Sequence, residues 1–358
     1  MIKDRLLKIK LVEYFVRSFW YPQMEVNILS KHRISNTPKV ITDVDVLGLF
    51  PDPTGSLKKI LGDCKTLKNQ SPIARSLWMK GLMEYFDSTK GLIILSKNVE
   101  KEHQLTSSVL DIQLLSDADF TLYSKATADY KISFESALTE IDNWDKLFEI
   151  EKKFPPLRKF LEFSRTQFWN EATSNYQLRT AIAILREHKG EFNPSNRLHL
   201  SAVLNHFSLV AIALSNLVNT LFNRYLAPKS KDELNADLKV LIYGGIENYD
   251  FLNTLRHRFS AHTVPEKDLT LPEWELFLEL IRLSFEQPKV FMLLPLYLKE
   301  IAFQFLTDDT KHYSYSDILM SKEPQLSNFS VRISQYLTKA SGLPPEFHEL
   351  YAEKFAFS

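Results

Sequence analysis

The stretch TDVDVLGLFPDPTGSLKKILGDCKTLK, residues 42–68, holds two runs rich in Val, Ile and Leu, joined by the turn-forming residues PDPTG. Such runs predict two β-strands that pair as a hairpin. Each run also contains charged residues that a buried strand disfavours, namely Asp43, Asp45, Asp63 and Lys65. These charges need a reason other than strand formation.

Strand geometry groups these charges. Residues two apart in a strand point to the same face, so we expect Asp63 and Lys65 to project together, with Cys64 in the core. Asp43 and Asp45 share a face of the preceding strand, and hairpin pairing lets Asp45 meet Asp63 across the ladder. Opposed carboxylates repel, and Mg²⁺ relieves this repulsion through oxygen ligands. A neighbouring lysine holds or helps deprotonate metal-bound water, as metal-assisted phosphodiester hydrolysis requires. The alternative is that the acids lie on a solvated sheet face.

The flanking sequence predicts an α/β arrangement. Apolar spacing and turn residues indicate, in order, a helix over 3–19, strands over 24–30, 39–50 and 57–67, a helix over 71–86, a strand over 91–98, and a helix or helix–strand unit over 103–120. We expect Ser71 to cap the helix over 71–86, with Pro72 in its first turn. The order α-β-β-β-α-β-α is typical of three layers around a mixed sheet.

The pattern changes after about residue 142. Strand-like runs nearly vanish, and helical segments follow one another, separated by Pro- and Gly-containing breaks. We therefore predict an α/β domain over 1–135, an all-α domain over 145–310, and a helical C-terminal extension over 311–358.

Composition narrows the class of protein. The chain has 358 residues, enough for two domains, with 44% hydrophobic and 25% charged residues. Lys+Arg and Asp+Glu number 44 each, so no global positive charge points to nucleic acid or membrane. The single cysteine, Cys64, excludes an internal disulfide and suits the cytoplasm. The first 20 residues lack the apolar core of a signal peptide, and the apolar run 199–226 contains polar residues. We expect that run to be a buried helix and the protein to be cytoplasmic, without a membrane partner.

Residues 1–125 resemble the PD-(D/E)XK nuclease superfamily. The resemblance rests on a leading helix with an acidic residue, the strand TDVDVLGL, the strand LKKILGDCKT with its D-x-K triplet, and the following helix and GLIILSKN strand. It implies a restriction-endonuclease-like fold in which Asp45 and Asp63 bind the metal and Lys65 is the catalytic lysine. Glu13 matches an extra acid that many members carry, and Asp43 competes with Asp45 for the first role. The resemblance also implies Mg²⁺ or Mn²⁺ as cofactor, DNA rather than RNA as substrate, and a role in antiviral defence.

A second cluster lies in NTLRHRFSAHTV, residues 253–264. On a continuous helix, Arg258 and His262 share a face. Together with Arg256 and His257 they offer an acid or base and a phosphate-stabilising cation, as metal-free RNA cleavage requires. The alternative is a basic helix end that interacts favourably with the helix dipole.

Residues 170–300 resemble the all-helical HEPN superfamily. Its motif matches Arg256, His257 and His262, with five intervening residues where four is more usual. The resemblance implies a ribonuclease, a homodimer through the motif helices, or a scaffold for partner proteins. The remaining histidines show no metal-ligand spacing, and phosphate-loop, dinucleotide-binding and nucleophile-elbow motifs are absent from the sequence.

Three functions therefore compete. The first is a metal-dependent nuclease centred on Asp45, Asp63 and Lys65. The second is a metal-independent ribonuclease centred on Arg256 and His262. The third is a nucleic-acid-binding or assembly module without catalytic activity.

Overall fold

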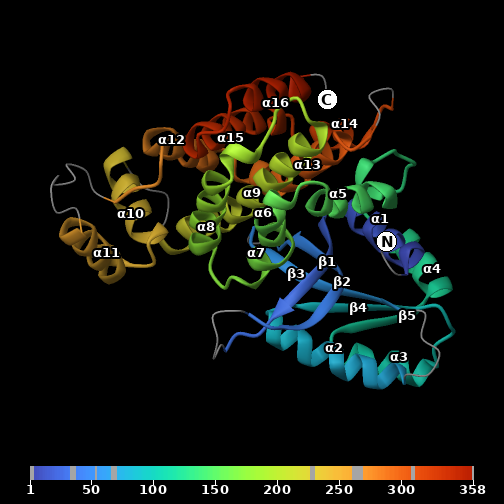
Figure 1. Cartoon of the computed structure of the whole chain (residues 1–358). Helices are drawn as coiled ribbons and strands as arrows, with labels where there is room; N and C mark the ends of the chain where they lie inside the picture. Colours follow the sequence, from blue (N-terminus) through green and yellow to red (C-terminus); the bar gives the residue numbers. More distant parts are fainter. Residues whose placement is uncertain are drawn as a thin grey trace.

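A five-stranded mixed sheet is followed by a large helical part (Figure 1). The computed structural model describes residues 4–32, 38–52, 55–65, 71–225, 230–259, 269–307 and 311–356. The sheet has the order β1-β2-β3-β4-β5. Its strands are β1 (Tyr21–Leu29), β2 (Val40–Pro51), β3 (Leu57–Lys65), β4 (Lys90–Leu95) and β5 (Ile112–Ser116).

The strands form an antiparallel meander that continues into a parallel sheet. β2 pairs antiparallel with β1 and β3, as the hairpin prediction requires, whereas β3–β4 and β4–β5 are parallel. The parallel connections run through α2 (Pro72–Phe86) and α3 (Lys101–Ser108). The predicted order α-β-β-β-α-β-α is confirmed, and the unit expected over 103–120 is a helix–strand–helix unit that adds β5 and begins α4 (Asp117–Thr127).

Helices cover both faces of the sheet. On one face α1 (Arg5–Arg17) lies close to the strands, because Gly62 leaves room for Leu11: a Cβ on Gly62 would come within 2.3 Å of the Leu11 side chain. α2 and α3 lie on the opposite face, below the sheet in the view shown (Figure 1). There Gly91 similarly allows Met79 of α2 to approach. These layers form the expected mixed sheet flanked by helices.

The described part of the chain after α4 is helical apart from its connections. The longer helices are α5 (Ile141–Lys153), α8 (Ser174–Glu187), α9 (Arg197–Tyr225), α10 (Lys231–Ile242), α11 (Ile246–Phe259), α12 (Trp274–Glu286), α13 (Pro288–Gln304), α14 (Tyr315–Lys322), α15 (Leu326–Ser341) and α16 (Glu346–Ala356). Shorter segments are η1 (Ala137–Thr139), η2 (Pro155–Leu157), α6 (Arg158–Glu162), the π-helical η3 (Phe163–Gln167), α7 (Phe168–Asn170) and η4 (Lys189–Glu191).

α9 is the central helix of this part and packs along α13. By length and composition α9 could cross a membrane, but 94% of its most apolar 18-residue window is buried inside the protein. The expectation of a buried helix over this run is confirmed. Because α13 also packs on β1, the two parts of the chain share one continuous hydrophobic core.

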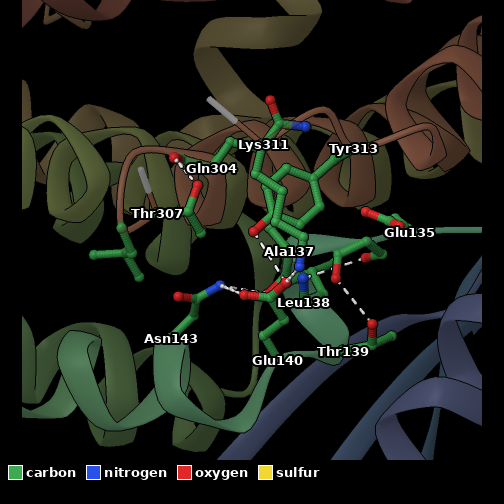
Figure 2. Close-up of polar contacts among 12 residues, drawn as sticks. Glu135, Ala137, Leu138, Thr139, Glu140, Asn143, Gln304, Thr307, Lys311 and Tyr313 are labelled. Carbon is green, nitrogen blue, oxygen red and sulfur yellow. Dashed lines mark hydrogen bonds and ion pairs between the residues drawn. The ribbon is translucent and has the colours of Figure 1, made fainter. Parts of the chain in front are cut away.

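A polar segment around η1 connects the sheet region with the helices. Figure 2 shows the Asn143 side chain donating to the Ala137 carbonyl at 3.0 Å and to the Glu140 carboxylate at 3.3 Å. Tyr313 and Lys311, from the segment before α14, contact the same Glu140 carboxylate (Figure 2). Contacts from α5 and from the segment before α14 therefore hold the chain around η1, where it leaves the sheet region.

Candidate active site at the fork between β2 and β3

The sheet opens where β2 and β3 separate. Their pairing ends with Val46 opposite Gly62; beyond it β2 continues along β1, and β3 continues along β4. Asp45 and Asp63 are the first residues past the last pair. Asp45 Oδ2 accepts a hydrogen bond from the backbone N–H of Cys64 at 2.7 Å, which links the two strands across the opening. Both carboxylates are therefore positioned by the backbone at this fork.

Lys65 joins the two acids. Its Nζ lies 3.1 Å from Asp45 Oδ2 and 3.7 Å from Asp63 Oδ1. Both acids are buried, and Asp45 is only 2% exposed, whereas the Lys65 side chain is 28% exposed. Cys64 is fully buried between them, as strand alternation predicts, and burial raises the pKa of its thiol. The structure thus brings Asp45, Asp63 and Lys65 together, with Lys65 Nζ between the two carboxylates.

Lys8 of α1 is a site residue that the sequence did not reveal. Its side chain is 3% exposed, and its Nζ lies 2.8 Å from Asp45 Oδ1 and 2.5 Å from Glu25 Oε1. Burial disfavours the charged ammonium, but the two carboxylates outweigh it and raise the pKa of Lys8. Burial likewise disfavours ionised Asp45, but the charges of Lys8 and Lys65 lower the pKa of its carboxyl. Both partners are therefore charged at neutral pH.

Glu25 occupies an irregular position in β1. It lies between the pairs Met24–Val46 and Val26–Val44, so the register places it beside Asp45. Its φ of 57° is in the left-handed region, which non-glycine residues rarely adopt. Such strain persists only where surrounding contacts impose it, and here the side chain binds Lys8. Nothing in the alternating sequence of this strand signals that conformation.

Arg75 of α2 holds the second acid. Its Nε and Nη2 donate to Asp63 Oδ2 and Oδ1 at 2.7 and 2.5 Å, a two-point geometry that fixes the carboxylate plane. The guanidinium also lies over the Trp78 ring, 3.7 Å from its centroid. Burial raises the pKa of the Asp63 carboxyl, and Arg75 limits that rise. A signal for Arg75 existed in the sequence, because the helix after β3 must return over the sheet to start the parallel strand β4.

A cleft of about 500 Å³ opens onto the fork. Its walls come from the sheet, from α1 and α5, and from Arg165 of η3. Seven acidic and four basic side chains line it: Asp4, Glu25, Asp43, Asp45, Asp145, Glu149 and Glu151, and Lys8, Lys65, Lys152 and Arg165. Acidic side chains therefore outnumber basic ones in the lining of this cleft, although Glu25, Asp45 and Asp145 are paired with Lys8, Lys65 or Arg5.

Two predicted residues are not at the fork. Glu13 lies five residues after Lys8, about 140° around the helix, and its Oε1 accepts from Arg17 Nε at 2.9 Å. It lines a different cavity, beside Tyr14. The structure therefore does not bring Glu13 to Asp45. Asp43 is exposed at the rim of the cleft, so Asp45 is the acid that meets Lys65.

The second candidate cluster is only partly described. Arg256, His257 and Arg258 are exposed in the last turn of α11, which lies far from the sheet in the view shown (Figure 1). His262 lies outside the described residues, as does the expected end of the helix before Pro265. A site formed by Arg256, His257 and His262 stays a prediction.

The fork offers the implied metal ion two carboxylates, those of Asp45 and Asp63. In the described ranges, no group of three or more His, Cys, Asp or Glu side chains is arranged to hold a metal ion. Mg²⁺ usually takes only one or two protein carboxylates, with water and substrate oxygens completing its shell. Asp45 and Asp63 supply that donor type and number, although Lys8, Lys65 and Arg75 now contact their oxygens. These residues fit Mg²⁺ or Mn²⁺ if one cationic side chain moves away from a carboxylate oxygen.

The fork thus combines two carboxylates with three cationic side chains beside an open cleft. Such a set can orient water and stabilise charge on a phosphate. Comparison with known proteins adds no family to this geometry, because no family model, no curated protein and no solved structure matches the chain.

Proposed function

We propose that the protein is a metal-dependent nuclease that hydrolyses phosphodiester bonds in nucleic acid at Asp45, Asp63 and Lys65. The observation that carries this proposal is the convergence of these three side chains at the fork, with Lys65 Nζ 3.1 Å from Asp45 and 3.7 Å from Asp63. DNA as the preferred substrate follows from the resemblance to the PD-(D/E)XK superfamily.

The order of elements supports the same proposal. A helix, an antiparallel three-stranded meander, a helix and a parallel fourth strand follow one another from α1 to β4. That is the order which the resemblance implies, with the two acids and the lysine on its second and third strands. We propose the restriction-endonuclease-like fold for this region on that basis.

The residues divide the work as follows. Asp45 and Asp63 would hold Mg²⁺ or Mn²⁺, which supplies charge neutralisation and an activated water for attack on phosphorus. Burial alone lowers the pKa of Lys65, but the two carboxylates raise it above its usual value. Lys65 beside these two carboxylates is therefore protonated, and it can donate a hydrogen bond to the attacking water or to a phosphate oxygen. Arg75 acts through Asp63, whose carboxylate it orients.

Cleavage assays on the full chain test this proposal. Duplex DNA, single-stranded DNA and RNA are each incubated with Mg²⁺, Mn²⁺ or EDTA. We expect divalent-dependent DNA cleavage that Lys65→Met reduces by about 10²–10⁴-fold. Lys58→Met is the matched control, because Lys58 lies on the same strand and pairs with Asp52, away from the fork.

Three results would contradict the proposed nuclease activity at Asp45, Asp63 and Lys65. The first is DNA cleavage that survives Lys65→Met and Asp45→Asn. The second is cleavage that is unaffected by EDTA. The third is RNA cleavage that is lost only in His262→Ala, which would assign the activity to the cluster on α11.

A further inference from the structure

The buried charges at the fork sum to zero. Lys8 bridges Glu25 and Asp45, Lys65 bridges Asp45 and Asp63, and Arg75 holds Asp63. Three negative charges therefore face three positive ones. All six side chains are buried or less than a third exposed.

A divalent cation disturbs this balance. Added alone, it would leave two excess positive charges among these largely buried side chains, and buried charges without partners are disfavoured. Compensation has two sources. Either a side-chain cation leaves the acids, or negative charge enters with the metal. A phosphodiester brings one negative charge, and deprotonation of the attacking water supplies another.

Of the three cations, Lys8 contributes to the charge balance of the fork without a proposed role in the cleavage step. Lys65 borders the cleft and is partly exposed, and Arg75 is held by both oxygens of Asp63 and by Trp78. Lys8 is almost fully buried, and both of its carboxylate partners stay within hydrogen-bond distance. Its ammonium lies 2.8 Å from Asp45 Oδ1, one of the oxygens that Asp45 would offer to a metal.

We infer that the site takes up its divalent cation together with the substrate phosphate rather than before it, and that Lys8 imposes this order. The inference rests on the proposed function. Lys8 is here a positioning residue: it acts on the metal through Asp45 and Glu25. Because binding linkage is reciprocal, nucleic acid and metal must raise each other's affinity by the same factor.

Mn²⁺ titration of the full chain without nucleic acid tests the role of Lys8. We expect weak binding in the wild type and, because Lys8→Met leaves one net negative charge, Mn²⁺ binding tighter by about tenfold or more. Glu25→Gln leaves one net positive charge and weakens binding. The double variant Lys8→Met/Glu25→Gln is neutral again and returns to the wild-type dissociation constant. Lys10→Met is the matched control on the same helix, since Lys10 pairs with Asp117 outside the site.

A second titration tests the coupling. A DNA duplex with non-cleavable phosphorothioate linkages should tighten Mn²⁺ binding to the wild type by about 5–150-fold, the usual range of coupling between sites. In Lys8→Met the same duplex should tighten Mn²⁺ binding far less, because this variant already binds Mn²⁺ without the charge of the phosphate.

An Mn²⁺ dissociation constant that is equal in the wild type, Lys8→Met and Glu25→Gln overturns the inference. Glu25→Gln keeps Lys8 and leaves no buried acid unpaired. Its Mn²⁺ dissociation constant, compared with that of the wild type, therefore tests the inference even if Lys8→Met does not fold. The titrations need no cleavage. Wild-type DNA cleavage with equal dissociation constants overturns only the order of binding, whereas shifted constants without any cleavage overturn only the nuclease.

Discussion

The side-chain nitrogen of Lys299 on α13 donates a hydrogen bond to the side-chain oxygen of Gln23 on β1 at 2.6 Å. Lys299 is completely buried, donates to the Tyr21 hydroxyl at 3.1 Å, and lies 4.3 and 5.0 Å from the ring centroids of Tyr21 and Trp144. Within the described ranges no carboxylate forms an ion pair with it. This contact ties the helical part to the sheet, and burial lowers the pKa of Lys299 well below its usual value.

The depressed pKa of Lys299 predicts a pH-dependent stability. Between its folded and unfolded pKa values, the unfolded chain binds more protons than the folded protein, so the contribution of Lys299 to the free energy of unfolding rises with pH. Relative to Lys299→Met, the wild type should gain up to about 1.4 kcal/mol per pH unit as pH rises toward about 10.4. Urea denaturation of both proteins at pH 7, 8, 9 and 10 measures the difference. A difference that is flat over this range would contradict a lowered pKa.

Gly62→Ala should destabilise the protein. A Cβ at this position would lie 2.3 Å from Leu11 and 2.8 Å from the carbonyl oxygen of Val46, so α1 must move away from the sheet. Overpacking of this kind costs about 1–3 kcal/mol. Gly81→Ala is the control: nothing lies within 4 Å of its Cβ on α2, and alanine in a helix interior should stabilise by about 0.5–1 kcal/mol. Equal midpoints in chemical denaturation would refute the close approach of α1.

Glu300→Gln should loosen the connection at η1. The buried Glu300 carboxylate accepts hydrogen bonds from Ser136 Oγ at 2.6 Å and from the N–H groups of Ala137 and Leu138 at 2.9 and 3.4 Å. An amide replaces one acceptor with a donor, and a buried donor left unpaired costs about 1–3 kcal/mol. Glu140→Gln, which affects the partly exposed contacts in Figure 2, should cost at most about 1 kcal/mol. Denaturation midpoints in the reverse order would disprove this assignment.

Arg75→Lys should impair the proposed cleavage of nucleic acid more than folding. A lysine cannot reproduce the two-point contact with Asp63, so the carboxylate loses its fixed orientation. We expect kcat to fall by about tenfold or more while KM changes little, because the misplaced group acts in the transition state. Lys80→Met on the same helix, whose pair with Glu84 lies at the surface, should retain wild-type kcat. An unchanged kcat in Arg75→Lys would show that Asp63 needs no guanidinium.

The centre of the site could be predicted from the sequence because it depends on backbone periodicity. Strand alternation alone puts Asp63 and Lys65 on one face with Cys64 on the other, and a hairpin brings Asp45 across from Asp63. The structure shows Lys65 beside Asp63 and Cys64 in the core, but Asp45 and Asp63 lie just past the last β2–β3 pair, where Lys65 bridges them. The hairpin and the helix that starts at Pro72 follow from local residue preferences in the same way.

The surrounding residues depend on packing and were not foreseen. Lys8 and Glu13 lie on different sides of α1, and the sequence of one amphipathic helix does not tell which side meets the fork of the sheet. Lys8 is buried there, whereas Glu13 pairs with Arg17 elsewhere. The left-handed backbone of Glu25 has no sequence signal, because glutamate rarely adopts it.

The alternation of Asp63, Cys64 and Lys65 also favours one register of the hairpin over registers shifted by one residue. A slip of β3 by one residue against β2 would turn both charges toward Leu11 and the apolar layer beneath α1, and would turn the thiol of Cys64 to the face that Asp63 and Lys65 now occupy. Such a misaligned chain would bury ions without partners, so it could not compete with the correct alignment. The residues proposed to cut nucleic acid would therefore also select the correct register of β3 against β2. A variant with an uncharged fork would lose this selection together with the proposed activity.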